Sequence, residues 1–149
     1  TITAPEMTRF LLTLDQAVDT VFTALKEAHA GETYVPNAPA ATVLNIAKAL
    51  VGDRAVEIKI TGIRPGEKMH EIMVSEEEMH HCVKRDDYYA IRPMLPELVN
   101  NQVAEPNALT KEFSSADTVL DLEGTIALLN QHKLMIEDAE TDTDEELLR

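Results

Sequence analysis

Residues 61–71, T-G-I-R-P-G-E-K-M-H-E, divide the chain between an alternating apolar run and a second apolar group. Arg64, Pro65, Gly66 and Glu67 are typical of a type II turn, because proline fixes φ at the second position and glycine accepts the positive φ of the third. Such a turn can simply join two elements. It can also present charge, since an arginine fork matches phosphate oxygens and a carboxylate accepts hydrogen bonds from sugar hydroxyls. The residues alone leave both interpretations open.

The residues before this turn predict short elements. Val56, Ile58 and Ile60 alternate with charged residues, which is the period of a half-buried strand. Residues 42–51 predict an amphipathic helix that ends at Gly52. Before it, residues 32–35 predict a strand.

An amphipathic helix is predicted nearer the N-terminus. Thr13 and Gln16 form a T-x-x-Q capping box at its start, and Gly31 is expected to close its end. Apolar residues recur at helical spacing between these signals. They are Leu14, Ala17, Val18, Val21, Phe22, Leu25 and Ala28.

The residues after the turn complete a mixed pattern. Ser75 and Glu78 form another capping box and predict a helix to about Val83. Residues 88–91 predict a strand, and residues 93–112, which contain three prolines, look irregular. A last helix is predicted from Leu122 to His132. Because helices and strands interleave, the expected fold class is α/β, as a mixed α+β fragment.

Composition limits the class of protein. The chain has 149 residues, enough for one modest domain, and 27 acidic against 13 basic residues give a formal net charge of -14. Nucleic-acid binding needs a basic field, so we expect no nucleic-acid partner. Seven of the acidic residues lie in residues 137–146, which we expect to be a solvated end of the chain.

The cysteine content and the apolar runs of the sequence also indicate where in the cell the protein lies. The single cysteine, Cys82, cannot form an internal disulfide, which agrees with a reducing compartment. No apolar run reaches the roughly 18 residues that span a membrane, and the N-terminus lacks a secretory signal. We therefore expect a cytoplasmic protein without a membrane partner. The chain starts at Thr1, and its first residues are β-like, so we also expect a fragment.

Four motifs resemble those of one bacterial family and occur in the same order along the chain as in that family. They are M-T-R-F-L-L-T-L-D-Q-A-V-D-T-V, G-I-R-P-G-E-K-M-H-E-I-M-V-S-E-E-E, D-D-Y-Y-A-I-R-P and E-F-S-S. The chain resembles, over residues 1–129, the C-terminal, substrate-binding part of the UDP-N-acetylglucosamine 4,6-dehydratases with 5-epimerase activity. These polysaccharide biosynthesis proteins and their 4-epimerase relatives belong to the extended short-chain dehydrogenase/reductases. The resemblance does not separate a dehydratase from a 4-epimerase, and it does not identify the UDP-sugar.

The resemblance implies roles for three residues. Arg9 of the M-T-R-F motif and Arg64 are expected to hold the diphosphate of a UDP-sugar, and Glu67 is expected at the uridine ribose. Two guanidinium groups can neutralise a diphosphate, and an acidic protein needs such local positive charge to accept an anion.

The family's redox machinery is not present in this sequence. The resemblance implies NADP in the full enzyme, held by a Gly-rich Rossmann half, with a Y-x-x-x-K pair for proton transfer. The five glycines form no G-x-x-G-x-x-G, and no tyrosine is followed four residues later by lysine. We therefore assign no catalytic residue here and expect no cofactor to bind this chain alone.

The resemblance also implies a division of the chain. Residues 1–39 would pack on the Rossmann domain, residues 40–132 would form the small substrate-binding lobe, and residues 133–149 would be a disordered acidic tail. A fragment would expose the stripe around Val18 and Phe22, so we expect a homo-oligomer or a Rossmann partner. The expected function is the UDP-sugar-binding portion of the enzyme, catalytically incomplete alone. The alternative is a non-catalytic binding or oligomerisation module.

Other candidate sites are weaker. His70, His80, His81 and Cys82 include metal ligands, but neighbours on a helix point about 100° apart, so we expect a helix surface and no metal. Ser114 and Ser115 lack a nearby histidine and acid in the sequence, so we expect no nucleophile. Three methionines, Met69, Met73 and Met79, are interpreted as core filler. Tyr88 and Tyr89 are expected on opposite faces of their strand, one buried and one exposed.

Overall fold

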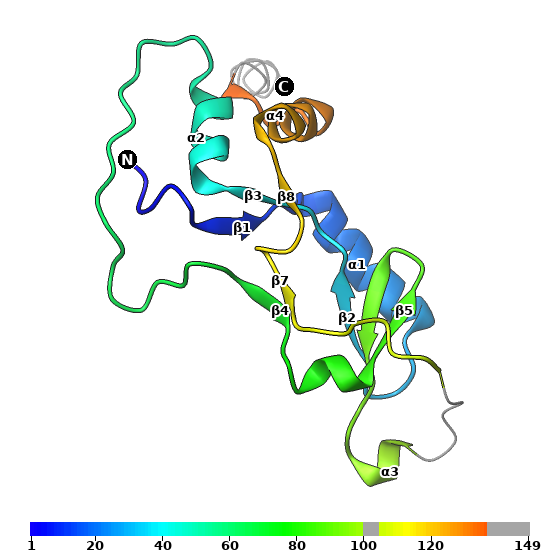
Figure 1. The fold of residues 1–149 in the computed structure, drawn as a ribbon. Coiled ribbons are helices and arrows are strands. Elements are labelled where there is room, and N and C mark those ends of the chain that lie inside the picture. The colour runs from blue at the N-terminus through cyan, green and yellow to red at the C-terminus, as the bar shows by residue number, and fades with distance from the viewer. Residues whose placement is uncertain (100–104, 137–149) are drawn as a thin grey trace.

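The computed structural model describes residues 1–99 and 105–136, and shows the mixed α and β class that the sequence predicts (Figure 1). The helices are α1 (Leu14–Glu27), α2 (Val43–Val51), α3 (Pro96–Val99), α4 (Leu122–Gln131) and the 3-10 helix η1 (Glu78–His81). The strands are β1 (Thr8–Phe10), β2 (Thr33–Pro36), β3 (Ala40–Thr42), β4 (Ile72–Val74), β5 (Cys82–Arg85), β6 (Tyr88–Ile91), β7 (Phe113–Ser114) and β8 (Val119–Leu120).

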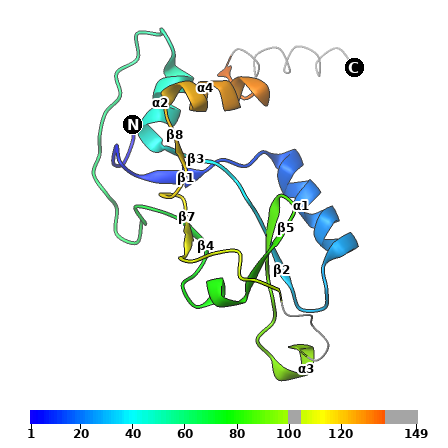
Figure 2. The same ribbon diagram turned by 45° about the vertical axis from the view of Figure 1, so that its right-hand side comes forward.

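The first sheet has the order β1-β3-β8. β3 pairs antiparallel with β1 and parallel with β8, and its residues Ala40 and Ala41 are almost completely buried. Helices α2 and α4 pack on each other at one end of this sheet, as both ribbon views show (Figures 1 and 2). Each helix begins at a side-chain cap: Thr42 accepts from the Asn45 N–H, and Asp121 accepts from the Gly124 N–H.

The second sheet has the order β2-β6-β5, and both of its pairings are antiparallel. The predicted capping box of Thr13 and Gln16 is present at the start of α1, and α1 lies beside β2 (Figure 2). No residue of α1 is buried. The expected exposure of its apolar stripe is confirmed, with Phe22 66% and Leu25 79% exposed.

The third sheet, β4 with β7, lies against the core. Val35, Val74, Cys82, Ile91 and Phe113 form one buried cluster. As predicted for core filler, Met73 and Met79 pack against it, as does the ring of Tyr89. Tyr88 instead packs against Tyr34, so the two neighbouring tyrosines do face different surroundings, but both are half-buried.

The strand predicted at residues 56–60 is wrong. The structure shows only an isolated parallel bridge between Ile2 and Ile60, and Val56 and Ile60 are both more than half exposed. A strand requires a neighbouring strand to satisfy its backbone, and here only Ile2 and Thr3 of the described residues lie alongside. The alternating pattern therefore belongs to the long connection between α2 and β4, which both ribbon views show as a wide loop.

The helix predicted from Ser75 to Val83 is also wrong. The reciprocal hydrogen bonds of Ser75 and Glu78 are present, but they start only the single turn of η1. Residues 82–85 then form β5, because their backbone groups pair with β6 across a tight turn in which Asp86 has a φ of 46°. The tertiary pairing thus overrides a local start signal.

Three smaller differences occur at element ends. α1 ends at Glu27 with an extended cap at Ala28, and Gly31, at φ 82°, forms the later turn from His29 to Glu32. The short helix α3 lies within residues 93–112, which were expected to be irregular. The predicted acidic tail falls mostly on residues 137–149, outside the described residues. Within residues 1–99 and 105–136, no helix has the length and apolarity needed to cross a membrane.

Candidate functional site

The R-P-G-E turn has the conformation that its sequence predicts. The Glu67 N–H donates to the Arg64 carbonyl at 3.1 Å, which closes the turn, and Gly66 has a φ of 86°. The Glu67 carboxylate also accepts from the Arg64 N–H at 2.9 Å. Two hydrogen bonds between Arg64 and Glu67 therefore fix the turn backbone and the Glu67 carboxylate.

The chain on the N-terminal side of the turn is anchored to the first residues of the protein. The Ile2 N–H donates to the Lys59 carbonyl, and the Thr61 and Gly62 N–H groups donate to the carbonyls of Ile2 and Thr3. The Thr61 hydroxyl adds a bond to the Ile2 carbonyl at 3.2 Å. Residues 59–62 thus form a fixed stem.

The chain on the C-terminal side is anchored to β1. The Thr8 N–H donates to the Met69 carbonyl at 2.9 Å, and Thr8 Oγ1 lies 2.8 Å from His70 Nδ1. Residues 63–68 therefore form a short tip between two stems that are both held by the N-terminal segment. We call residues 63–68 the turn tip.

A pair of buried hydroxyl groups completes the second stem. Ser115 Oγ lies 2.6 Å from Thr8 Oγ1 and accepts from the Glu71 N–H at 2.9 Å. The Ser115 N–H donates to the Glu71 carbonyl at 2.8 Å. Ser115 is completely buried and Thr8 is 3% exposed. The motifs M-T-R-F, G-E-K-M-H-E and E-F-S-S, which are far apart in the sequence, meet at this pair.

Arg9 lies against the same stem. Its Nη1 donates to the Thr8 carbonyl at 2.7 Å and reaches the Met69 carbonyl at 3.5 Å, and its Nε lies 3.6 Å from Glu71 Oε1. The side chain is 30% exposed. The structure therefore brings Arg9 to the chain segment that supports the turn, with part of its donor capacity already used within the protein.

Arg64 differs from Arg9 in having a free guanidinium. Its side chain is exposed and has no hydrogen-bond or ion-pair partner within residues 1–99 and 105–136. Lys68, also on the turn tip, is exposed as well. Glu67 is half-buried and uses Oε2 for the Arg64 N–H, which leaves Oε1 for another donor. The turn tip can therefore offer an anion one free arginine fork beside a carboxylate.

The sequence reasoning did not identify Thr8, His70 and Ser115 as a connected group. Thr8 and Ser115 do lie in the motifs that carry the resemblance, and this was the available signal. The structure also places a histidine near Ser115, through Thr8, although the sequence shows none nearby. Because Ser115 is completely buried and its hydroxyl is hydrogen-bonded, this arrangement positions the backbone and does not present a nucleophile.

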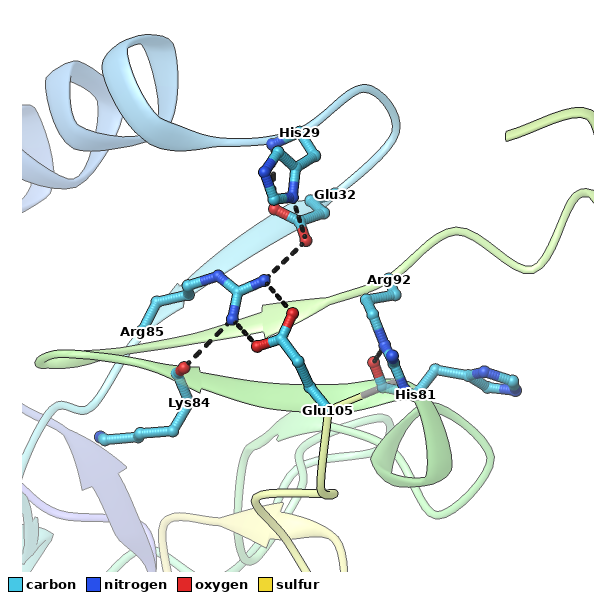
Figure 3. A network of polar contacts seen from close by, with 7 residues as sticks. All are labelled: His29, Glu32, His81, Lys84, Arg85, Arg92 and Glu105. Carbon is cyan, nitrogen blue, oxygen red and sulfur yellow. Dashed lines mark hydrogen bonds and ion pairs between the residues drawn. The ribbon is translucent and has the colours of Figure 1, made fainter. Parts of the chain in front are cut away.

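A second polar cluster has a structural explanation (Figure 3). Arg85 binds both carboxylate oxygens of Glu105, one at 2.9 Å, and also lies 3.3 Å from Glu32, whose side chain is completely buried. The Glu105 hydrogen bond raises the pKa of Arg85, and the same bond lowers the pKa of Glu105. The cluster joins the end of the α1–β2 connection, the β5–β6 hairpin and residue 105. Its ion pairs tie these three segments together.

The residues considered for metal binding are separated by the fold. Cys82 is buried in β5, where burial raises the pKa of its thiol, and His80 is exposed on η1. His70 contacts Thr8 instead. Among the residues that the structure describes, no three histidine, cysteine or acidic side chains are grouped so that they could hold a metal ion.

The turn tip lies within the segment of this chain that is similar to known proteins. The family model described as "Polysaccharide biosynthesis protein" matches residues 1–93. A UDP-N-acetylglucosamine 4,6-dehydratase (inverting) of Campylobacter jejuni is 39% identical over 94 residues, which cover 63% of this chain and 28% of that protein. A UDP-glucose 4-epimerase of Rickettsia massiliae is 45% identical over 93 residues, 61% of this chain and 27% of that protein. The chain thus spans little more than a quarter of each relative.

A solved structure has the same fold. The structure titled "X-ray structure of Pen from Bacillus thuringiensis" superimposes with a TM-score of 0.76 and 23% sequence identity. The match covers 90% of this chain and 40% of the other chain. It therefore extends well beyond residue 93, where the family match ends, and shows that the later elements also belong to this fold.

Proposed function

Because the chain belongs to the polysaccharide biosynthesis protein family, we propose that it is the UDP-sugar-binding part of a nucleotide-sugar 4,6-dehydratase or epimerase. The proposed ligand is of the UDP-N-acetylglucosamine type, and the proposed setting is cytoplasmic synthesis of bacterial surface polysaccharide. One observation carries the proposal: Arg64 has a free guanidinium on a turn tip whose two stems are both hydrogen-bonded to the N-terminal segment. The two fixed stems limit the backbone entropy that is lost when a ligand binds, and the Arg64 side chain is the part that becomes ordered.

The three proposed binding residues have unequal parts. Arg64 binds the diphosphate with its free fork, and Glu67 accepts from a ribose hydroxyl with Oε1 while Oε2 keeps the turn closed. Arg9 already lies 3.6 Å from Glu71 and donates to the Thr8 carbonyl, so a diphosphate would compete with these contacts for its guanidinium. We therefore expect Arg64 to contribute more to affinity than Arg9.

The chain's residues do not fit the cofactor of the proposed reaction. NADP requires a glycine-rich turn where the backbone meets the pyrophosphate, and the five glycines of this chain do not have that spacing. Three of them, Gly52, Gly62 and Gly66, lie with open space beside the position of a Cβ. We assign no reaction step to this chain, and NADP and the groups that transfer protons would come from a Rossmann half.

Calorimetric titration with UDP-N-acetylglucosamine tests the proposal. We expect binding that weakens with added salt, because Arg64 and Arg9 act through charge. Arg64→Ala should lower affinity by about tenfold or more, and Arg64→Lys should restore only part of it, because lysine lacks the planar fork. Lys59→Ala is the matched control, since it removes one exposed positive charge from the same loop outside the turn tip. Equal losses for Arg64→Ala and Lys59→Ala would contradict a specific site.

A second candidate function rests on a different observation. The exposed apolar face of α1 favours an association module, which pairs with another copy or with a Rossmann half. Sedimentation velocity over a range of concentrations tests it. A dimer that Phe22→Glu converts to a monomer would favour this function, whereas a monomer at all concentrations would reject self-association.

A further inference from the structure

A separate pocket of about 440 Å³ opens between the β2–β3 connection and the segment that carries β7. Asn37, Pro39 and Tyr89 line it from one side, and residues 108–113 with 117 and 118 line it from the other. Neither Arg9 nor the turn tip contributes to its walls. Its volume is within the range of small-molecule sites. Most of its lining also falls after residue 93, outside the segment that the family model matches.

The floor of this pocket is aromatic and fixed in place. The rings of Tyr89 and Phe113 lie 5.1 Å apart, and Phe10 packs on Phe113 at the same centroid distance. Phe113 is 6% exposed, so its ring supports the Tyr89 ring from below and leaves Tyr89 as the more accessible aromatic surface. Lys84 lies 4.4 Å from the centre of the Tyr89 ring. Buried packing on several sides holds the floor, which favours binding to a preformed surface.

The rim of the pocket carries hydrogen-bonding groups that the protein does not use. Within the described part of the chain, the Tyr89 hydroxyl and the Glu112 carboxylate have no hydrogen-bond partner, and both residues line the pocket. Burial raises the pKa of Tyr89, so its hydroxyl remains a donor at neutral pH. Thr110 and Thr118 add hydroxyl groups to the rim.

The charges of the lining residues favour an uncharged ligand over an anionic one. Lys111 is the one cation among the lining residues, and it is already paired with Asp117. The Asp117 carboxylate also accepts from the Ser114 N–H at 2.8 Å. Glu112 adds a second negative charge, so a phosphate or diphosphate would meet two carboxylates within the lining, and the Lys84 ammonium beside the Tyr89 ring is not one of the lining residues.

We propose that this pocket binds an uncharged, hydroxyl-rich ring of monosaccharide size. The apolar C–H face of such a ring matches the aromatic floor, and its hydroxyl groups match the unpaired groups of Tyr89 and Glu112. The site is distinct from the proposed diphosphate site at the turn tip. Its existence does not depend on UDP-sugar binding there.

Nitrogen-15 NMR titration with N-acetylglucosamine and methyl α-glucoside tests the inference. We expect binding on the order of millimolar, with amide shifts in Asn37, Ala38 and residues 108–118 and none in the turn tip. Tyr89→Phe removes only the hydroxyl and should weaken binding by about threefold to tenfold. Tyr88→Phe is the matched control, because Tyr88 packs on Tyr34 and lies outside the pocket lining. Glu112→Gln, on the rim, gives a second variant that preserves the floor and should also weaken binding.

A competition experiment with UDP tests whether the sugar binds in the pocket or at the proposed nucleotide site. UDP should not displace N-acetylglucosamine, and Arg64→Ala should leave its affinity unchanged. Displacement by UDP, or shifts confined to the turn tip, would overturn the second site and leave the proposed nucleotide site intact. The proposed sugar pocket would be overturned directly if saturating sugar caused no amide shifts. It would also be overturned if the sugar bound equally well to Tyr89→Phe, Glu112→Gln and the unmodified chain. Failure of UDP-N-acetylglucosamine to bind would reject only the proposed function.

Discussion

The hydroxyl oxygens of Thr8 and Ser115 lie 2.6 Å apart, although 107 positions separate the two residues in the chain. This contact joins β1 to the end of β7 and holds the backbone of Glu71 between them. The R-P-G-E turn lies just before that backbone. A buried hydroxyl pair, with no exposed atom of Ser115, therefore supports the exposed residues that we propose bind the ligand.

We predict that Ser115→Ala destabilises the protein by about 2 kcal/mol, because it removes the acceptor of the part-buried Glu71 N–H and leaves the buried Thr8 hydroxyl with His70 alone. Denaturant unfolding measures the loss. Hydrogen exchange should increase at residues 69–71 but not in the β5–β6 hairpin. Ser114→Ala is the control, because that hydroxyl accepts only a 3.3 Å bond from the Ala116 N–H, and its loss should cost less. If Ser115→Ala and Ser114→Ala lower the free energy of unfolding equally, the Thr8–Ser115 hydroxyl pair has no special role in stability.

We predict that Gly66→Ala weakens UDP-N-acetylglucosamine binding and lowers stability by about 1 kcal/mol. Gly66 has a φ of 86°, which side chains disfavour, while the space beside it is open. The cost is therefore conformational and not steric. Gly66→Asn should recover part of the loss, because asparagine tolerates positive φ better than alanine. If alanine and asparagine behave alike, the turn does not require this conformation.

We predict that replacing two leucines, which both lie on amphipathic helices, lowers the free energy of unfolding by very different amounts. Leu129→Ala in α4 should cost about 2–5 kcal/mol, because Leu129 is 6% exposed and its removal leaves a cavity. Leu25→Ala in α1 should change the free energy of unfolding by less than about 0.5 kcal/mol, since Leu25 is 79% exposed. Chemical denaturation at low protein concentration compares them. A large cost for Leu25→Ala would show that α1 is covered in solution.

We predict that acid weakens the cluster around Arg85. The Arg85 hydrogen bond lowers the pKa of Glu105 below its ordinary 4.5, so the pair stabilises the fold at and above that pH. The stability is lost as the pH falls through the lowered pKa. Glu105→Gln should remove this part of the acid dependence, which unfolding measured from pH 7 to pH 3 detects. An unchanged pH profile would mean that the pair contributes nothing in solution, as exposed ion pairs often do.

Some features could be predicted because their interactions are local. The Thr13–Gln16 capping box and the closed R-P-G-E turn use partners within four residues, so the sequence contains both members of each pair. The same locality explains an error. Ser75 and Glu78 formed their capping bonds as predicted, but a local start signal does not decide how far a helix continues.

The sequence by itself therefore determined the mixed class, the main helices, the turn conformation and the family. The tertiary structure decided which strands have partners: residues 82–85 gained one in β6, whereas residues 56–60 found only Ile2 and Thr3. It also decided that Thr8, His70 and Ser115 meet, and that Tyr89 and Glu112 face one pocket. These contacts join residues that are distant in the chain, so they form only when the whole chain folds and the gain from burial exceeds the entropy lost on closing the loops between them.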